Sequence, residues 1–434
     1  MIHIIGGGTF SYVRAHLALA APARGTTARA LHAAYTRLES DEGSVALKEH
    51  AKLHLTRMAD PTSPLETNQD VAWRIDQLVA DPATRMIYMN AALCDFEGAV
   101  VDKMNQEGET IWVGPTPSGK YAPRLRTCEG EKTLLLTPAE KVLHRVRRER
   151  KDIFLVAFKA TCGATADQQY AQALNMLKAS SANLVLANDV MTGHCMVVAP
   201  EETRYFEGPR TQALLGLVRM ADQRSTNTFT RSTVVPGPLV PFQTSPLVPE
   251  NLRQVVNWLT QQGAYKPFRG STAGHFAARV SSTCCLTSRR KTNYTKPGGL
   301  DLVRVEYQGL DKVVAVGAKP SVGGQSQRIV FSEHQDLDCI VHAHIPMLPH
   351  PEDPIPVAGQ FAYECGSHQC GANTSRNLQS FAHGIHAVML DNHGPNIVFS
   401  RGTPAEEVIK FIQANFDVKG KTGGLVQWPQ AEHA

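Results

Sequence analysis

The chain has 434 residues, of which 42% are hydrophobic, and this is enough for two or three globular domains. The formal net charge of +4 is small, and the dense basic run at residues 144–151 is interpreted as a solvated helix end, so we expect no nucleic-acid partner. The absence of long apolar runs and of a secretory signal, together with an odd count of nine cysteines, predicts no membrane segment and a reducing, cytoplasmic location.

The chain begins with a short apolar strand at residues 1–5 that leads into three glycines and Thr9. A strand, a glycine-rich turn and a helix let backbone N–H groups approach a phosphate at the helix N-terminus. We therefore predict that Gly7, Gly8 and Thr9 contact a nucleotide. An ordinary tight turn has the same pattern and remains the alternative.

The next segments are predicted to be helical. Pro22 and Gly25 separate a short first helix from a second that ends near Tyr35. Residues 40–80 have a polar helical pattern in which Trp73 is assigned to the core.

Residues 84–96 are predicted to form a buried strand with polar residues at its carboxyl end. Open α/β sheets bind ligands at the carboxyl ends of their strands, so Asn90 and Asp95 are candidate site residues, with turn or capping roles as the alternative. A hairpin at residues 120–138 and a helix that begins at Pro138 are expected to follow.

Two more buried strands, at residues 151–161 and 184–190, enclose an amphipathic helix at 167–178. Alternating strands and helices over about 190 residues favour a parallel, Rossmann-like sheet.

This half of the chain resembles the phosphopantothenoylcysteine synthetase domain of coenzyme A biosynthesis. The resemblance rests on five segments in the family's order, namely 7–9, 91–96, 120–138, 158–160 and 187–190. It implies a site for CTP or ATP that includes Lys159, Asn188 and Asp189, and activation of a carboxylate for capture by cysteine.

Three positions depart from that family's catalytic pattern. Ala18 aligns near the loop Asn, Thr161 stands in place of a Glu, and Lys178 lies two residues from the position of a Lys. We therefore expect a nucleotide-like pocket but not ordinary coenzyme A synthesis.

Five prolines between residues 236 and 249 mark a change of composition. They predict an extended, semi-rigid linker at 233–249 between a domain at 1–232 and a domain at 250–434. An amphipathic helix at 250–261 is expected to open the second domain.

The second half contains two apolar strands that end in histidines. His342 and His344 project to the same face of the first strand because they are two residues apart, and His393 stands at the end of the second. Three neutral imidazoles with an open fourth position are typical of a catalytic Zn²⁺ or a similar divalent metal. Hydrogen-bonded core histidines are the alternative, since the chain has 17 histidines.

From about residue 250 the chain resembles the class II aldolase/adducin family. The matching segments are 271–279, 295–298, 319–321, 342–344 and 392–394. The resemblance implies an α/β/α sandwich, a homo-oligomer that is usually a cyclic tetramer, and zinc on the three histidines.

The first matching segment corresponds to the family's phosphate-binding turn. Backbone N–H groups at Ser271, Thr272 and Gly274 would hold a phosphate, and Lys296 would add positive charge. Without the resemblance, an ordinary loop is the simpler interpretation.

Two residues differ from the aldolase pattern. Gly323 stands where the family has its acid/base Glu, and His275 stands where the phosphate turn has an Asn. A base is still needed to move a proton. Glu333 and Tyr363 are our candidates, and Glu364 and His334 are the alternatives.

Together these patterns predict an α/β protein, with a Rossmann-like parallel-sheet domain followed by an α/β/α class II aldolase-like domain. The favoured function is a metal-dependent lyase for a small phosphorylated or acyl substrate, fused to a nucleotide-binding domain. A non-catalytic oligomeric scaffold and a CTP- or ATP-dependent carboxylate–amine ligase are the alternatives.

Overall fold

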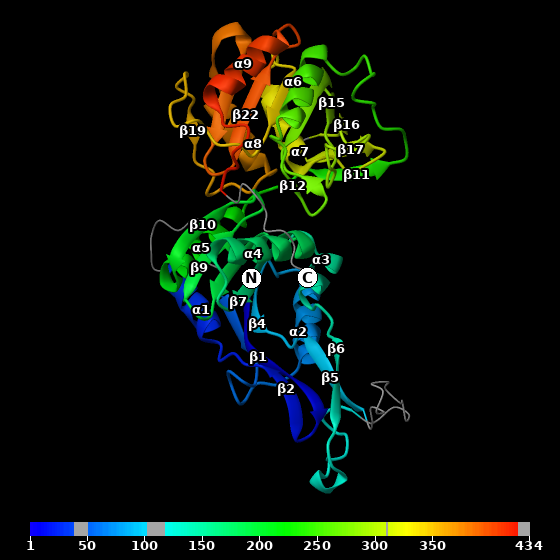
Figure 1. The fold of residues 1–434 in the computed structure, drawn as a ribbon, viewed down its shortest axis with the longest axis vertical. Helices are drawn as coiled ribbons and strands as arrows, with labels where there is room; N and C mark the ends of the chain where they lie inside the picture. The colour runs from blue at the N-terminus through cyan, green and yellow to red at the C-terminus, as the bar shows by residue number, and fades with distance from the viewer. Residues whose placement is uncertain (39–50, 102–117, 310, 424–434) are drawn as a thin grey trace. The chain divides into compact units, whose positions relative to one another are not determined.

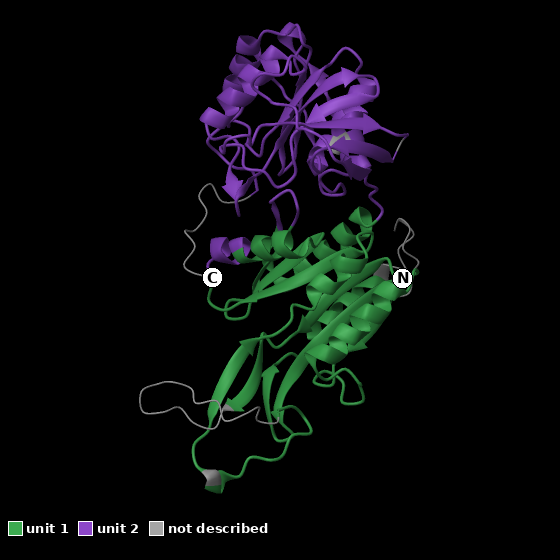
Figure 2. Ribbon diagram, turned by 90° about the vertical axis from the view of Figure 1, so that its right-hand side faces the viewer, with its two compact units in different colours: residues 1–164, 172–198, 206–225 green, residues 165–171, 199–205, 226–434 purple. Residues whose placement is uncertain are grey.

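The structure, a computed structural model, describes residues 1–38, 51–101, 118–309 and 311–423. The chain divides into two compact units (Figure 2). Unit 1 consists of residues 1–164, 172–198 and 206–225, and unit 2 consists of residues 165–171, 199–205 and everything from 226 onward.

Unit 1 is built on an eight-stranded sheet whose central strands are parallel (Figure 1). In spatial order its strands are β10 (Arg204–Pro209), β9 (His194–Val198), β8 (Leu184–Asp189), β7 (Phe154–Thr161), β4 (Met86–Ala92), β1 (Ile2–Arg14) and β2 (Leu17–Ala21), with β3 (Ala51–Leu55) also paired to β1. The Rossmann-like parallel sheet predicted from the sequence is confirmed.

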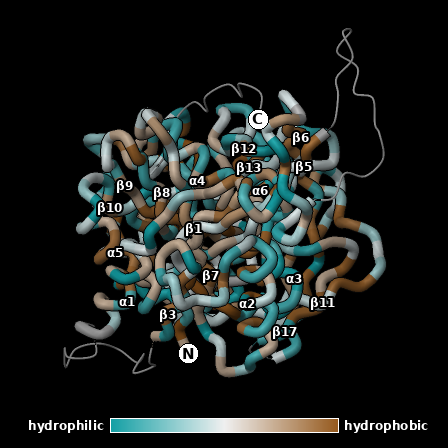
Figure 3. Tube along the Cα trace, turned by 90° about the horizontal axis from the view of Figure 1, so that it is seen from below, coloured by the Kyte–Doolittle hydropathy of each residue, from teal (hydrophilic) through white to brown (hydrophobic). Residues whose placement is uncertain are grey.

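The described helices of unit 1 are α1 (Thr26–Leu38), α2 (Asn68–Ala80), α3 (Leu143–Glu149), α4 (Ala166–Ser180), which straddles the unit boundary, and α5 (Arg210–Arg224). Helices α1, α2 and α5 contact the sheet, and α3 contacts α2. A separate two-stranded ribbon joins β5 (Phe96–Val101) to β6 (Thr133–Pro138). Strand β6 of this pair carries three consecutive exposed leucines, Leu134, Leu135 and Leu136. Figure 3 colours the chain by the hydropathy of each residue.

Several local predictions for unit 1 were wrong. Residues 17–21 form strand β2 rather than a helix, residues 51–55 form strand β3, and β6 pairs with β5 rather than with a strand that starts near residue 120. Trp73 is 55% exposed, so it lies outside the core. Residues 40–50 of the expected helical segment lie outside the described residues.

The prediction of a glycine-rich turn after residue 5 was also wrong, because β1 runs unbroken from Ile2 to Arg14. Gly6, Gly7 and Gly8 pair with β4 within the sheet. A Cβ atom at any of the three would lie within 3.0 Å of a neighbouring segment, which explains why only glycine fits there.

Unit 2 contains a ten-stranded sheet that is mostly antiparallel. In spatial order its strands are β11 (Arg231–Val235), β17 (Lys312–Val316), β16 (Val303–Tyr307), β15 (Cys284–Thr287), β14 (His275–Ser281), β18 (Cys339–His342), β22 (Gly394–Phe399), β21 (His386–Leu390) and β19 (Val357–Ala358), with β20 (Gln379–Ser380) also on β21. A short hairpin, β12 (Pro267–Phe268) and β13 (Ser271–Thr272), lies apart from it.

Helices cover both faces of this sheet. On one face α6 (Glu250–Gln261) and α9 (Ala405–Asn415) share a core with Phe276 and Val341, and on the other α7 (Val322–Glu333) packs over Ala277 and Ile340 and against α8 (His368–Asn377). Adjacent residues of one strand thus face opposite helical layers, as strand geometry requires. The α/β/α sandwich is confirmed.

The proline-rich segment at 233–249 is part of unit 2 and is not a free linker. Strand β11 pairs in parallel with β17, Val240 bridges to Leu302, and Phe242 is fully buried in the core. The five prolines all follow β11, which ends at Val235, so none of them removes an N–H group from its pairing with β17. The long stretch of unit 2 that contains this segment begins at Thr226, not at residue 250.

None of the helices in the described part of the chain has the length and hydrophobicity needed to span a bilayer.

Candidate metal centre

Three buried histidines meet at one end of the central strand β18. His342 is its last residue, His344 follows two residues later, and His393 lies in the turn between β21 and β22. Gly394 allows this meeting, because its φ is +148° and a Cβ atom there would lie within 3.0 Å of the Ala343 carbonyl oxygen. The glycine thus brings the His393 turn against the segment that carries the other two rings.

The geometry of the three rings fits a divalent cation. One nitrogen of each ring lies within 4.8 Å of the others, and Nε2 of His342 is 3.2 Å from Nε2 of His393. Tetrahedral zinc with Zn–N bonds of about 2.0–2.1 Å would place its nitrogen ligands about 3.3 Å apart.

A main-chain contact sets the tautomer of His342. Its Nδ1 lies 2.9 Å from the Pro395 carbonyl oxygen, which can only accept, so Nδ1 carries the proton and Nε2 presents a lone pair to the cluster. Burial lowers the pKa of His342 to about 4, so the ring is neutral at pH 7. A neutral, oriented imidazole is the form that binds a metal.

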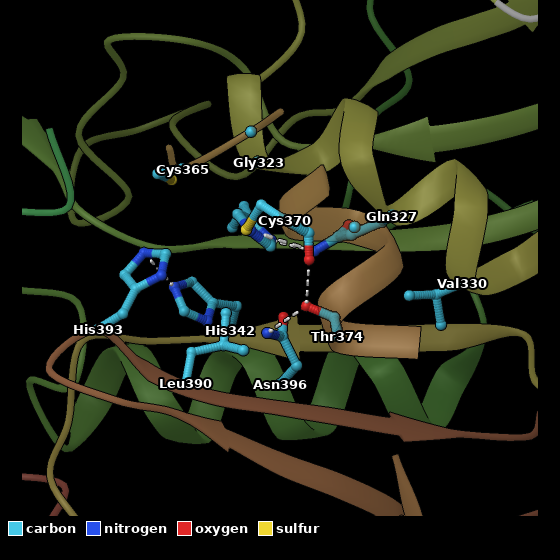
Figure 4. Close-up of a pocket in the computed structure, with 13 residues that line it drawn as sticks. Gly323, Gln327, Val330, His342, Cys365, Cys370, Thr374, Leu390, His393 and Asn396 are labelled. Atoms are coloured by element: carbon cyan, nitrogen blue, oxygen red, sulfur yellow. Dashed lines mark hydrogen bonds between the residues drawn. The ribbon is translucent and has the colours of Figure 1, made fainter. Parts of the chain in front are cut away.

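A small pocket adjoins the His342 and His393 rings (Figure 4). Helix α7 contributes Gly323 and Gln327, helix α8 contributes Cys370 and Thr374, and Figure 4 shows His342 and His393 side by side. The remaining lining residues are His275, Val330, Cys365, Gly366, Gly371, Leu390 and Asn396. No acidic side chain is among these thirteen residues.

His275 occupies the space beside Gly323. A Cβ atom at position 323 would lie within 3.0 Å of Cδ2 and Nε2 of the His275 ring. That ring stacks on His342 with centroids 4.6 Å apart and planes at 26°, and it is hydrogen-bonded to the Gln327 amide. Burial, and then the neighbouring His342, hold the pKa of His275 well below its usual value.

Neither of the two proposed bases is among these lining residues, although Tyr363 packs against a cluster that includes the lining residues Cys370 and Leu390. Glu333 is exposed at the end of α7, where its carboxylate accepts a hydrogen bond from Ser375. Tyr363 packs against a small apolar cluster that includes Ala358 and Val388.

The predicted phosphate turn is engaged in local structure. The Ser271 hydroxyl donates to the Phe268 carbonyl at 3.3 Å, and the Thr272 hydroxyl donates to the Thr292 carbonyl at 3.1 Å. Gly274 has a φ of +99°, and a Cβ atom there would meet the carbonyl oxygen of His342 at 2.6 Å. Lys296 lies in an exposed turn.

In unit 1, the predicted nucleotide residues line the carboxyl edge of the parallel sheet. Asn90, Lys159 and Asn188 are partly exposed near the ends of β4, β7 and β8. Asp95 is exposed, and its carboxylate lies 2.5 Å from the Lys141 ammonium group.

Two other predicted residues of unit 1 are buried and fully engaged. Thr9 donates to the Asn68 side chain and the Ala92 carbonyl. Asp189 accepts from the backbone N–H groups of Ala164 and Thr192. Burial opposes ionisation of Asp189, but these hydrogen bonds outweigh it and hold its pKa below the usual value.

Sequence reasoning missed several lining residues. Gln327 follows Gly323 by four residues, and Thr374 follows Cys370 by four, so helical periodicity would have placed each pair on one face. Nothing local in the sequence marks Asn396.

Comparison with known proteins gives matches in structure alone, since no protein-family model and no curated protein matches the chain. One similar solved structure is the DNA/pantothenate metabolism flavoprotein from Streptococcus pneumoniae, with 15% identity, a TM-score of 0.39, and coverage of 50% of this chain and 96% of that one. Two others are an L-fuculose 1-phosphate aldolase, with 17% identity, a TM-score of 0.29, and coverage of 38% and 82%, and YgbL from Escherichia coli, a putative aldolase/epimerase/decarboxylase, with 18% identity, a TM-score of 0.28, and coverage of 38% and 84%. The similar structures thus include both kinds of protein that the sequence resembles.

Proposed function

We propose that unit 2 is a divalent-metal lyase, similar in chemistry to aldolases and epimerases, that acts on a small phosphorylated or acyl substrate. The observation that carries the proposal is the convergence of His342, His344 and His393, with one nitrogen of each within 4.8 Å of the others. Zn²⁺ is the expected metal, because three imidazoles with an open position suit it.

The residues of the site would have different roles in this chemistry. The three histidines would hold the ion, which when bound would polarise a substrate carbonyl as a Lewis acid. The Pro395 carbonyl keeps His342 in the tautomer that binds metal. Lining groups that can exchange a proton are His275, Cys365 and Cys370.

Metal analysis of the purified full-length protein tests this proposal. We expect about one divalent ion per chain, and its loss in His342→Ala and in His393→Ala. His350→Ala is the matched control, because His350 is exposed and outside the cluster. A wild-type protein that takes up no divalent metal, or a His393→Ala variant that keeps it, would contradict the proposal.

For unit 1 we propose a site for CTP or ATP at the carboxyl edge of the sheet. Asn90, Lys159 and Asn188 support it, because they lie at the ends of neighbouring parallel strands, where such sheets bind ligands. Calorimetric titration of CTP and ATP into wild type and Lys159→Ala tests it. We expect binding to the wild type that weakens at least tenfold in the variant, and equal affinities would reject the site.

We also propose that the protein is a cytoplasmic homo-oligomer, a tetramer or larger. All nine cysteines are free, which supports a reducing compartment. Sedimentation velocity over a range of concentrations tests the assembly, and a persistent monomer would reject it.

A further inference from the structure

Unit 2 has a second cavity, which shares no lining residue with the pocket at the metal centre. It is formed by residues at the ends of β14 and β16 and by the second half of α7. Its volume is about 200 Å³, against about 10 Å³ for the pocket at the metal centre. A single buried water needs about 10–15 Å³ of such free space, so the second cavity has room for a small organic molecule.

The side chains that line this cavity are positively charged overall. Arg279 and Arg328 are among its nine lining residues, and none of the nine is Asp or Glu. The carboxylate of Asp338, which does not line the cavity, lies 3.9 Å from Nε of Arg279 and offsets part of that charge. Arg328 forms no ion pair with the described residues, so the cavity favours an anion over a cation or a neutral molecule.

The guanidinium group of Arg328 is held in place and still has N–H groups to donate. One of its Nη atoms donates to the Gly309 carbonyl oxygen at 2.8 Å, and its central carbon lies 5.5 Å from the centre of the Tyr307 ring. This is its only hydrogen bond to the described residues, whereas a guanidinium has five N–H groups. A positioned guanidinium with N–H groups to spare can bind an oxyanion at a small cost in side-chain entropy.

The guanidinium group of Arg279 is fixed in a similar way. Its Nη2 atom donates to the carbonyl oxygens of His334 and Leu337, and its central carbon lies 5.5 Å from the centre of the Phe331 ring. Both hydrogen bonds come from the same nitrogen, so Nη1 and Nε donate to no acceptor among the described residues. The cavity therefore has two oriented guanidinium groups, and each lies over an aromatic ring.

We propose that this cavity is a second ligand site of unit 2, for a small organic molecule that carries a phosphate or a carboxylate group. Arg279 and Arg328 hold the charged group, and Ile329 and the two aromatic rings contact the apolar part. Two lining residues, Ser282 and Ser332, are exposed, so the cavity is open to solvent. This site goes beyond the metal-dependent function proposed above and does not depend on it.

Calorimetric titration of the full-length protein tests the site. Phenyl phosphate and benzoate are the two anionic probes, and phenol is an uncharged analogue of both. We expect the wild type to bind one or both anions about tenfold or more tightly than phenol, because hydrogen bonds to a charged group are the stronger ones. The anion that binds more tightly identifies the preferred charged group. Failure of both anions to bind, or equal binding of phenol, would overturn the inference.

A substitution within the cavity and a matched control locate the binding. Arg328→Gln should weaken binding of the preferred anion about tenfold or more, because it removes hydrogen bonds to a charged group. Arg304→Gln is the control, because Arg304 lies on β16 outside the lining and pairs with Glu306 at 3.1 Å. It should bind the anion as the wild type does. Equal affinities of the two variants would place the anion elsewhere and overturn the inference.

Added negative charge gives an independent measurement at an exposed position, where folding is not at risk. Ser332→Asp places a carboxylate in the lining, and Gln335→Asp places one at an exposed position outside it. Anion binding should weaken in the first variant and not in the second, and an equal effect of the two would count against the site. His342→Ala should keep the affinity of the wild type, whereas a loss there would assign the anion to the metal centre and reject the second site.

Discussion

Gly323 and His275 are predicted to be coupled through direct contact. In Gly323→Ala the new Cβ atom would lie within 3.0 Å of two atoms of the His275 ring, and that ring is held between His342 and Gln327. Overpacking of this kind costs about 1–3 kcal/mol, while alanine in place of glycine in a helix recovers up to about 1 kcal/mol. We therefore expect Gly323→Ala to destabilise the protein by about 1–2 kcal/mol.

The same substitution should behave differently once the ring is removed. In a His275→Ala background the clash is gone, so Gly323→Ala should be neutral or stabilising by up to about 1 kcal/mol. The coupling energy, obtained from urea unfolding of all four full-length proteins, should be about 1–3 kcal/mol.

Gly359→Ala is the control for this cycle, because a Cβ atom at that position would have open space around it. Equal effects of Gly323→Ala in the two backgrounds would show that the contact between position 323 and the imidazole does not exist.

Other predictions concern the turn at the metal centre and unit 1. Gly394→Ala should reduce the metal content without changing any ligand, because its φ of +148° and the nearby main chain exclude a Cβ atom; full metal content would contradict this. Nδ1 of His3 lies 3.0 Å from Nε2 of His54, and burial lowers the pKa of each ring from 6.5 to about 4. As the pH falls below 6.5, these two histidines bind protons in the unfolded chain before they do so in the folded protein, which lowers the stability of the fold. The urea midpoint of the wild type should therefore drop between pH 6.5 and pH 4, and that of His54→Gln should drop less. Asp189→Asn should lower the urea midpoint at pH 7, since the carboxylate anchors two loops through main-chain N–H groups, and an unchanged midpoint would refute that role.

Patterns that repeat over a few residues predicted local structure correctly. The spacing of His342 and His344 placed two rings on one face, and the apolar positions of residues 250–261 gave α6 with the bounds that the structure shows. In both cases neighbouring residues determine the outcome, so strand and helix geometry suffice.

Features that depend on a distant neighbour were misread. Glycines at a turn and glycines at a close approach between segments are alike in sequence, so the run at 6–8 was assigned a turn although it continues β1. Prolines suggested a linker, but Phe242 is held in the core by residues far along the chain. The contact between His275 and Gly323 joins positions 48 residues apart (323 − 275), which no local pattern reveals.

The register of the sheet explains why His275 and Gly323 belong together. His275 and His342 are directly paired residues of the antiparallel strands β14 and β18, so a ring at 275 must lie against the ring at 342. Once it lies there, position 323 can hold only glycine. The histidine at 275 and the glycine at 323 therefore depend on each other, and a change at either position should be felt at the other.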